Sequence, residues 1–71
     1  MTKSIYREYY KVHFDGYTDC AECEQFADAL ARMDELKQKT DSECHIYMHT
    51  FKRVFVDGRM MCETTTVNFM V

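Results

Sequence analysis

The dipeptide Asp57-Gly58 is the feature that most constrains how this chain can fold. Asp-Gly between two runs of strand-forming residues is among the strongest short-range signals for a two-residue hairpin turn. The runs on either side, 44–56 and 59–71, contain many β-branched and aromatic residues. Such residues fit the pleated surface of a strand. The sequence therefore predicts a long C-terminal β-hairpin.

A two-residue turn also fixes which residues of the hairpin face each other. Val56 is expected opposite Arg59, and the pairs Ile46 with Phe69 and Lys52 with Glu63 then share one face. We expect a helix to cover the end of this face that carries Ile46 and Phe69. An ion pair is costly to bury, so coverage is expected to stop before Lys52 and Glu63. The hairpin should project beyond that point.

The tip of this projecting hairpin is apolar. Exposed apolar side chains on a long hairpin favour a contact with another chain, either a partner protein or a second copy. The alternative is a β-bulge near Thr50 that bends the hairpin back over the helix. The residues expected at the tip are Val54, Phe55, Val56, Met60 and Met61.

Two further elements are expected upstream of the hairpin. Residues 4–14 alternate in polarity as a half-buried strand does, and they end at the turn signal Asp15-Gly16. Apolar residues then recur at three- and four-residue steps, which predicts a helix over about residues 20–39, with Asp19 and Glu22 as its capping residues. Lys37 and Lys39 lie in its last turn, where cations are favourable.

These elements predict a single domain over residues 1–71 with the order β-α-β-β. The fold class is α+β, with one helix packed on a three-stranded, largely antiparallel sheet. We expect the C-terminal strand to lie in the middle of the sheet, because the first strand can then pair with it in antiparallel fashion. A chain of 71 residues leaves no room for a second domain.

Acidic residues gather at one end of the expected fold. No Lys or Arg occurs between Val12 and Ala31, although five carboxylates fall there. Acidic residues near a helix N-terminus favour the helix dipole and solubility, which is the ordinary explanation. The functional interpretation is a docking surface for a basic site on another protein. The acidic residues are Asp15, Asp19, Glu22, Glu24 and Asp28.

The sheet face that points away from the helix is expected to be aromatic and basic. Aromatic rings between cations on an open sheet are typical of single-stranded nucleic-acid binders, so this is one candidate function. A net charge of −3 excludes a strongly basic nucleic-acid-coating protein. The same face could instead be buried against a partner protein or in a homodimer. Its expected members include Arg7, Lys11, Tyr47, His49, Phe51 and Arg53, with Tyr9, His13, His45 and Phe55 beside them.

The segment Cys20-Ala21-Glu22-Cys23 resembles the redox motif of thioredoxin and glutaredoxin proteins. The chain contains no proline, whereas those folds use a cis-proline beside the thiols. Acidic neighbours would also raise the thiol pKa and oppose thiolate chemistry. We therefore expect Cys23 to be a core residue and keep a thiol or zinc protein as the second alternative. Neither a metal nor a cofactor is expected.

The βαββ plan, with the acidic stretch from Asp15 to Asp28 leading into the helix, resembles small phage-encoded inhibitors of host machinery. Polymerase inhibitors and anti-CRISPR proteins are among them. The resemblance implies a non-enzymatic protein-binding module from a phage or mobile element that acts on a host factor in the host cytoplasm. No catalytic constellation contradicts this interpretation. No apolar run approaches the roughly 20 residues needed to cross a bilayer, so a cytoplasmic protein is predicted.

Overall fold

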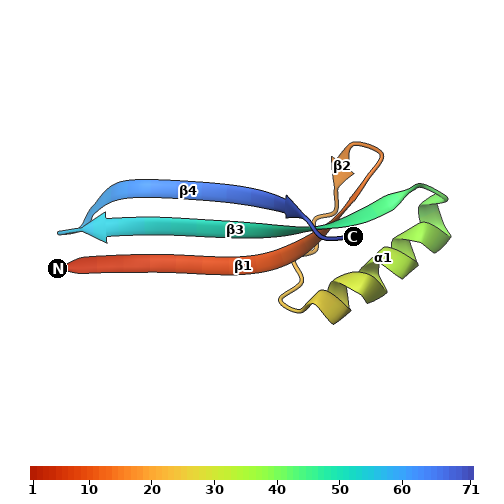
Figure 1. Cartoon of the computed structure of the whole chain (residues 1–71), viewed down its shortest axis with the longest axis horizontal. Helices are drawn as coiled ribbons and strands as arrows, with labels where there is room; N and C mark the ends of the chain where they lie inside the picture. The colour runs from red at the N-terminus through yellow and green to blue at the C-terminus, as the bar shows by residue number, and fades with distance from the viewer.

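The computed structural model describes all residues from 1 to 71 and shows an α+β domain with one helix and one antiparallel sheet. The elements follow in the order β1 (Thr2–Phe14), β2 (Tyr17–Thr18), α1 (Phe26–Thr40), β3 (Cys44–Val56) and β4 (Arg59–Phe69). The helix lies beside one end of the sheet, and β1, β3 and β4 extend together away from it (Figure 1). The predicted class, the single helix and the long C-terminal hairpin are confirmed.

The sheet order is β2-β1-β3-β4, so the prediction that the C-terminal strand lies in the middle is wrong. The first strand pairs with β3 along its whole length. Strand β3 supplies the buried residues Cys44 and Ile46, whereas every residue of β4 is exposed. A strand that contributes to the core needs neighbours on both sides, and a polar, exposed strand can lie at the edge. The fourth strand, β2, has only two residues and was not expected.

Both Asp-Gly dipeptides form turns, and the two-residue turn predicted at Asp57-Gly58 is confirmed. Asp15 and Gly16 have φ values of 49° and 77°, and Asp57 and Gly58 have φ values of 51° and 79°. Two consecutive residues with positive φ form the type I′ turn that matches the right-handed twist of antiparallel strands. These turns reverse the chain after β1 and between β3 and β4.

The helix begins at Phe26, about six residues later than predicted. Its N-cap is Gln25, which makes no side-chain capping hydrogen bond, so the capping roles predicted for Asp19 and Glu22 are wrong. The basic residues Lys37 and Lys39 do lie in its last turn, as predicted.

The residues expected in the first helical turn instead follow the edge of β1. The Asp19 N–H donates to the Val12 carbonyl at 2.8 Å. Tyr10 and Cys23 exchange two backbone hydrogen bonds of 2.7 and 2.9 Å. Pairing with β1 satisfies these backbone groups, and the helix begins only after this paired segment ends.

The core is small and lies where the helix crosses the sheet. Val12 and Ile46 are opposite each other on β1 and β3 and are fully buried. Cys23, which was expected in the core, packs against it together with Phe26, whereas Leu30 is 38% exposed. The buried residues are Val12, Ala29, Met33, Leu36, Cys44 and Ile46.

A β-bulge changes the register of the C-terminal hairpin just beyond its turn. Val56 opposes Arg59 as predicted, but Val54 opposes Cys62, so Met61 is an extra residue in β4. All predicted pairs beyond this point are therefore wrong by one residue. Since strand side chains alternate between faces, one extra residue moves the rest of β4 to the opposite face.

The bulge changes two specific expectations. Phe69 opposes Tyr47 on the face away from the helix, so it does not join Ile46 under the helix. Glu63 forms an ion pair of 2.9 Å with Arg53 rather than with Lys52. We call the sheet face that points away from the helix the outer face. It therefore gains the Phe69 ring and the Glu63 carboxylate, which the predicted register placed on the other face.

The molecule is elongated because the hairpin projects past the helix. Its extents are 49 × 22 × 17 Å, and its radius of gyration is 15.1 Å, against about 11 Å for a compact chain of this length. The tip does not fold back over the helix, so the alternative of a bend near Thr50 is wrong (Figure 1). The only helix is too short and too polar to cross a membrane.

We call residues 1–8 and 50–66, which include the turn 57–58, the arm, and the remainder of the chain the head. The arm residues of β1, β3 and β4 pair with one another throughout. All six buried residues lie in the head, so the arm has no core of its own.

Candidate functional site: the arm and the outer sheet face

The tip of the arm exposes apolar side chains, as the sequence predicted. Met60 is 55% exposed and Met61 is 65% exposed, while Val54, Phe55 and Val56 are half-buried by their neighbours. Phe55 and Met60 lie opposite each other on the outer face. Methionine side chains are flexible and polarizable, which suits them to binding surfaces that must adapt.

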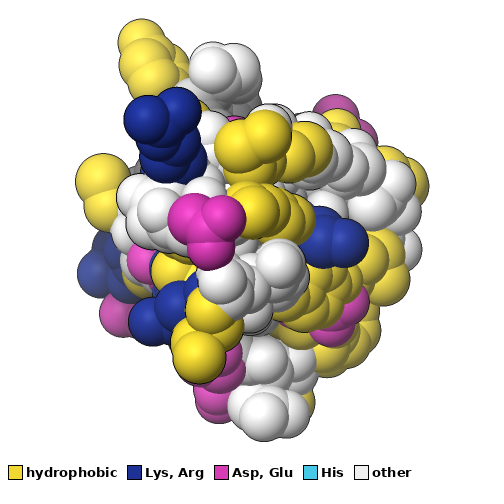
Figure 2. Space-filling view, turned by 90° about the vertical axis from the view of Figure 1, so that its left-hand side faces the viewer, with side chains coloured by type: hydrophobic (Ala, Val, Ile, Leu, Met, Phe, Trp, Pro, Cys, Tyr) yellow, Lys and Arg dark blue, Asp and Glu magenta, His cyan; other side chains and the backbone are white.

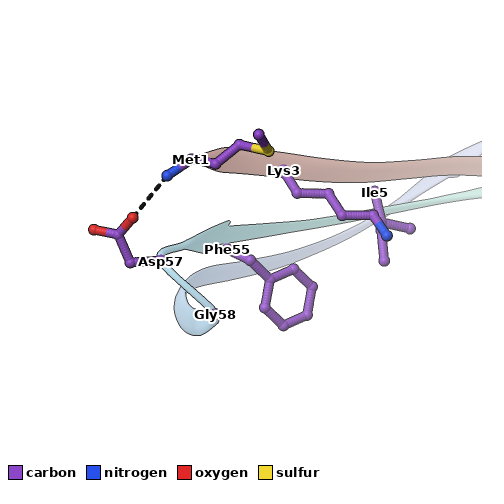
Figure 3. A pocket seen from close by; sticks show the side chains of 6 residues that line it. All are labelled: Met1, Lys3, Ile5, Phe55, Asp57 and Gly58. Carbon is purple, nitrogen blue, oxygen red and sulfur yellow. Dashed lines mark hydrogen bonds and ion pairs between the residues drawn. The ribbon is translucent and has the colours of Figure 1, made fainter.

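An open hollow continues this apolar surface onto β1 (Figure 3). The Phe55 ring and the side chain of Ile5 lie along it, and Ile5 is 41% exposed. The amino group of Met1 donates to the Asp57 carboxylate at 2.7 Å and ties β1 to the hairpin turn. The lining residues are Met1, Lys3, Ile5, Phe55, Asp57 and Gly58.

Charge is distributed unevenly between the two parts of the molecule. The arm carries five Lys and Arg against three Asp and Glu, a net charge of +2. The head carries four against nine, a net charge of −5, and together they give the −3 of the chain. Figure 2, which views the molecule from the tip, shows apolar side chains among basic and acidic ones. The apolar tip therefore lies in a mildly basic surrounding.

The outer sheet face carries the aromatic and basic residues that were predicted to share it. Their positions on β1 and β3 alternate regularly, because the bulge lies in β4. Tyr9 stacks on His49 with ring centroids 5.3 Å apart, and Phe69 meets Tyr47 edge-on at 5.4 Å. These rings form a continuous aromatic row along the part of the sheet that has no helix on this side.

Acidic side chains neutralise two of the cations on this face. Arg7 forms ion pairs with Glu22 at 3.2 Å and with Glu24 at 3.3 Å. Arg53 forms its ion pair with Glu63. Lys11 makes no ion pair and lies 6.0 Å from the centre of the Tyr9 ring. The face is therefore less basic than its sequence suggests.

The five carboxylates of the predicted acidic end do not form one free patch. Glu22 and Glu24 are held by Arg7, and Asp15 accepts a hydrogen bond of 2.6 Å from the Ser42 hydroxyl. Asp19 accepts two hydrogen bonds from the Arg32 guanidinium at 2.7 and 3.0 Å. Only Asp28 has no such partner, so internal contacts account for most of this cluster.

The Asp19 contact gives a prediction for stability against pH. Hydrogen bonds from Arg32 are the main reason that the pKa of Asp19 lies below its usual value. A carboxylate with a lowered folded-state pKa stabilises the protein above its unfolded pKa, and this stabilisation is lost as pH falls through the folded value. Asp19→Asn should therefore lower the urea midpoint at neutral pH and flatten its fall below about pH 4.

The control for this prediction is Asp34→Asn, which changes an exposed helix carboxylate that forms no ion pair. It should leave the pH profile of the urea midpoint unchanged. Equal profiles for the two variants would show that the contact between Asp19 and Arg32 does not stabilise the fold.

Two histidines on the outer face come together in a way that the sequence did not indicate. His13 and His49 have their Nε2 atoms 3.1 Å apart. His45 lies apart from this contact, with its Nε2 atom 3.3 Å from the Glu43 carboxylate. The predicted sheet order separated the first strand from residues 44–56, so it could not bring His13 and His49 together.

The Cys20 and Cys23 thiols lie before the helix, where the chain follows β1. Cys20 is exposed, and Cys23 is half-buried against the core, as expected. Burial, followed by the carboxylates of Asp28 and Asp19, raises the pKa of Cys23. A raised pKa reduces the thiolate that redox chemistry requires, so these residues do not favour the thiol alternative.

Other contributing residues were missed at the sequence level. Arg32 lies 13 residues from Asp19, and their contact depends on the path of the chain before the helix. Val67 and Phe69 join the outer face only because of the bulge.

No protein-family model matches the chain, and no curated protein or solved structure is significantly similar to it.

Proposed function

We propose that this protein is a non-enzymatic protein-binding module that docks through the tip of its arm. The observation that carries the proposal is the arm itself, a three-stranded sheet that extends beyond the helix with neither face covered. A sheet is independently stable in water only if it has three or more strands with a hydrophobic face or packs against a helix, and no helix packs on the arm. Only six of the 71 residues are buried, so the chain leaves much of its apolar surface free for a contact.

The side chains at the tip indicate what kind of partner would fit. Phe55, Met60 and Met61 would enter an apolar groove, because aromatic and methionine side chains are enriched at the centres of interfaces. Three cations of the arm form no ion pair, Lys3, Lys52 and Arg59, and they favour a partner whose groove has an acidic rim. We therefore propose a partner protein with an apolar, acid-rimmed groove.

This mode of action agrees with the resemblance to phage or mobile-element inhibitors of a host macromolecular machine. A small chain that places its arm in a groove blocks whatever the groove normally holds, and it needs no catalytic residue to do so. The proposed site of action is the host cytoplasm.

The second candidate is binding of single-stranded nucleic acid by the outer face. The aromatic row that contains Tyr9, Tyr47 and Phe69 favours it, because bases stack on such rings. The ion pairs of Arg7 and Arg53 count against it, since phosphates would have to displace carboxylates from both cations. We therefore place protein binding first.

The test is site-specific photo-crosslinking from position 60 in cells that naturally express the protein. The arm variant carries Phe55→Ala and Met60→Ala. Because position 60 is alanine in this variant, its crosslinker is placed at position 61. The control is Leu30→Ala, which removes an exposed apolar side chain from the head. The partner protein identified by crosslinking is then purified without the crosslink. We expect it to bind the wild type and the Leu30→Ala control equally, and the arm variant at least about a hundredfold more weakly.

Circular dichroism should show that both variants remain folded. Three results would contradict the proposal: equal binding by the arm variant, crosslinking only to a second copy, or crosslinking only to nucleic acid. In the last case, affinity for mixed single strands should fall steeply with salt and with Lys11→Ala.

A further inference from the structure

The His13 and His49 contact on the outer face is the starting point, and it is independent of the proposed docking by the tip. The two residues come from adjacent strands, where Tyr9 opposes His49 and His45 opposes His13. They therefore meet across a diagonal of the sheet, with an Nε2–Nε2 distance of 3.1 Å. A hydrogen-bonded sheet holds both backbones, which is a suitable support for a precise site.

Neighbouring aromatic rings fix the orientation of both imidazoles. Tyr9 stacks on His49 with an interplanar angle of 14°, and Tyr47 lies 4.2 Å from the centre of the His13 ring. Each histidine makes its only side-chain hydrogen bond with the other, and no carboxylate forms an ion pair with either. No other protein group therefore competes for the two Nε2 atoms.

The spacing of these nitrogens suits a shared metal ion. Two metal–nitrogen bonds of about 2.0–2.1 Å that meet at the tetrahedral angle place the nitrogens roughly 3.3 Å apart. Neutral imidazole is a favoured ligand of zinc, copper and nickel. The observed 3.1 Å is close to this spacing, and both rings must turn so that each unprotonated Nε2 points toward one shared position.

The charges around the pair act in both directions. Burial, and then Lys11, lower the pKa of His13, while burial, His13 and Lys11 lower that of His49. Glu22 acts in the opposite sense on His49. The rings are therefore neutral at about pH 7, as metal ligation requires, although the Lys11 ammonium weakens the attraction for a cation.

We propose that His13 and His49 form a two-histidine binding site for a divalent first-row transition metal ion. No third His, Cys, Asp or Glu completes a cluster within the chain. Water would fill the remaining coordination positions, so we expect affinity near the micromolar range rather than that of a structural zinc site. Zn²⁺ is the probe in the test below.

The test is a Zn²⁺ titration followed by NMR of the histidine ring protons. We expect the signals of His13 and His49 to move together and to saturate near one equivalent, while those of His45 stay in place. Either His13→Gln or His49→Gln should weaken binding by at least about tenfold, and His45→Gln should leave it unchanged. Lys11→Ala keeps both ligands and should tighten binding severalfold, because it removes a nearby positive charge.

Because protons compete for both ligands, binding should weaken as pH falls. The proposal is overturned if millimolar Zn²⁺ leaves the His13 and His49 signals in place. It is also overturned if the glutamine variants, shown by circular dichroism to be folded, bind as tightly as the wild type. If the folded glutamine variants still bind Zn²⁺, the thiols are its ligands. The contact between His13 and His49 is then only a hydrogen bond.

Discussion

Replacement of Ile46 by alanine is expected to lower the free energy of unfolding by about 2–5 kcal/mol. Ile46 is fully buried, opposite Val12 and within the core under the helix. Its backbone also pairs with Val71 through a hydrogen bond of 2.9 Å. A domain of this length has a total stability of roughly 4–11 kcal/mol, so this single change removes a large share of it. Urea unfolding followed by circular dichroism measures the loss.

The matched control is Ile5→Ala, which makes the same chemical change in the arm. Ile5 is 41% exposed, so we expect a loss below about 1 kcal/mol. If both variants lose the same stability, Ile5 must be covered in solution by another chain. That result would contradict an arm that is free until it meets its partner.

Replacement of Gly58 by valine should loosen the tip of the arm. Gly58 has a φ of 79°, and a left-handed backbone costs an L-residue about 1–2 kcal/mol, with β-branched residues at the upper end. A Cβ at this position would meet no atom within 4 Å, so the penalty comes from the backbone alone. Amide exchange should become faster in β3 and β4 near the turn, while the head stays protected.

The control for the turn is Gly58→Asn, because asparagine tolerates the left-handed conformation. We expect its exchange rates to stay close to those of the wild type. Equal acceleration in both variants would show that the turn needs a small side chain rather than a positive φ.

The local features of this fold could be predicted from the sequence. The two Asp-Gly turns, the period-two pattern of β1 and the projecting hairpin each depend on a few neighbouring residues. The order of the strands could not be predicted, because either order lets the first strand pair in antiparallel fashion. Burial of Cys44 and Ile46 decides it, and burial depends on the whole fold.

The register of β4 could not be predicted from the sequence, for a different reason. Both alternations of its side chains are plausible, since Lys52 and Arg53 can each meet Glu63. No glycine or other signal marks Met61 as the extra residue. Similarly, Asp19 and Glu22 have the spacing of a capping box, but their segment is already paired with β1.

The candidate site was predicted in its composition but not in its contacts. The apolar tip follows directly from the residues around Asp57-Gly58. The ion pairs that neutralise Arg7 and Asp19 depend on the loop before the helix, and the histidine pair depends on the strand order. Contacts between distant residues were therefore the part that sequence reasoning could not supply.

The position of β4 at the edge of the sheet has a consequence for how recognition is measured. One side of this strand presents main-chain donors and acceptors to solvent, with only Arg59 and Glu63 as charged residues and no proline to block it. An extended peptide could add there through the main chain alone. Alanine scanning would not detect such a contribution, because every amide survives the substitution. Proline or N-methylated residues along β4 would reveal it.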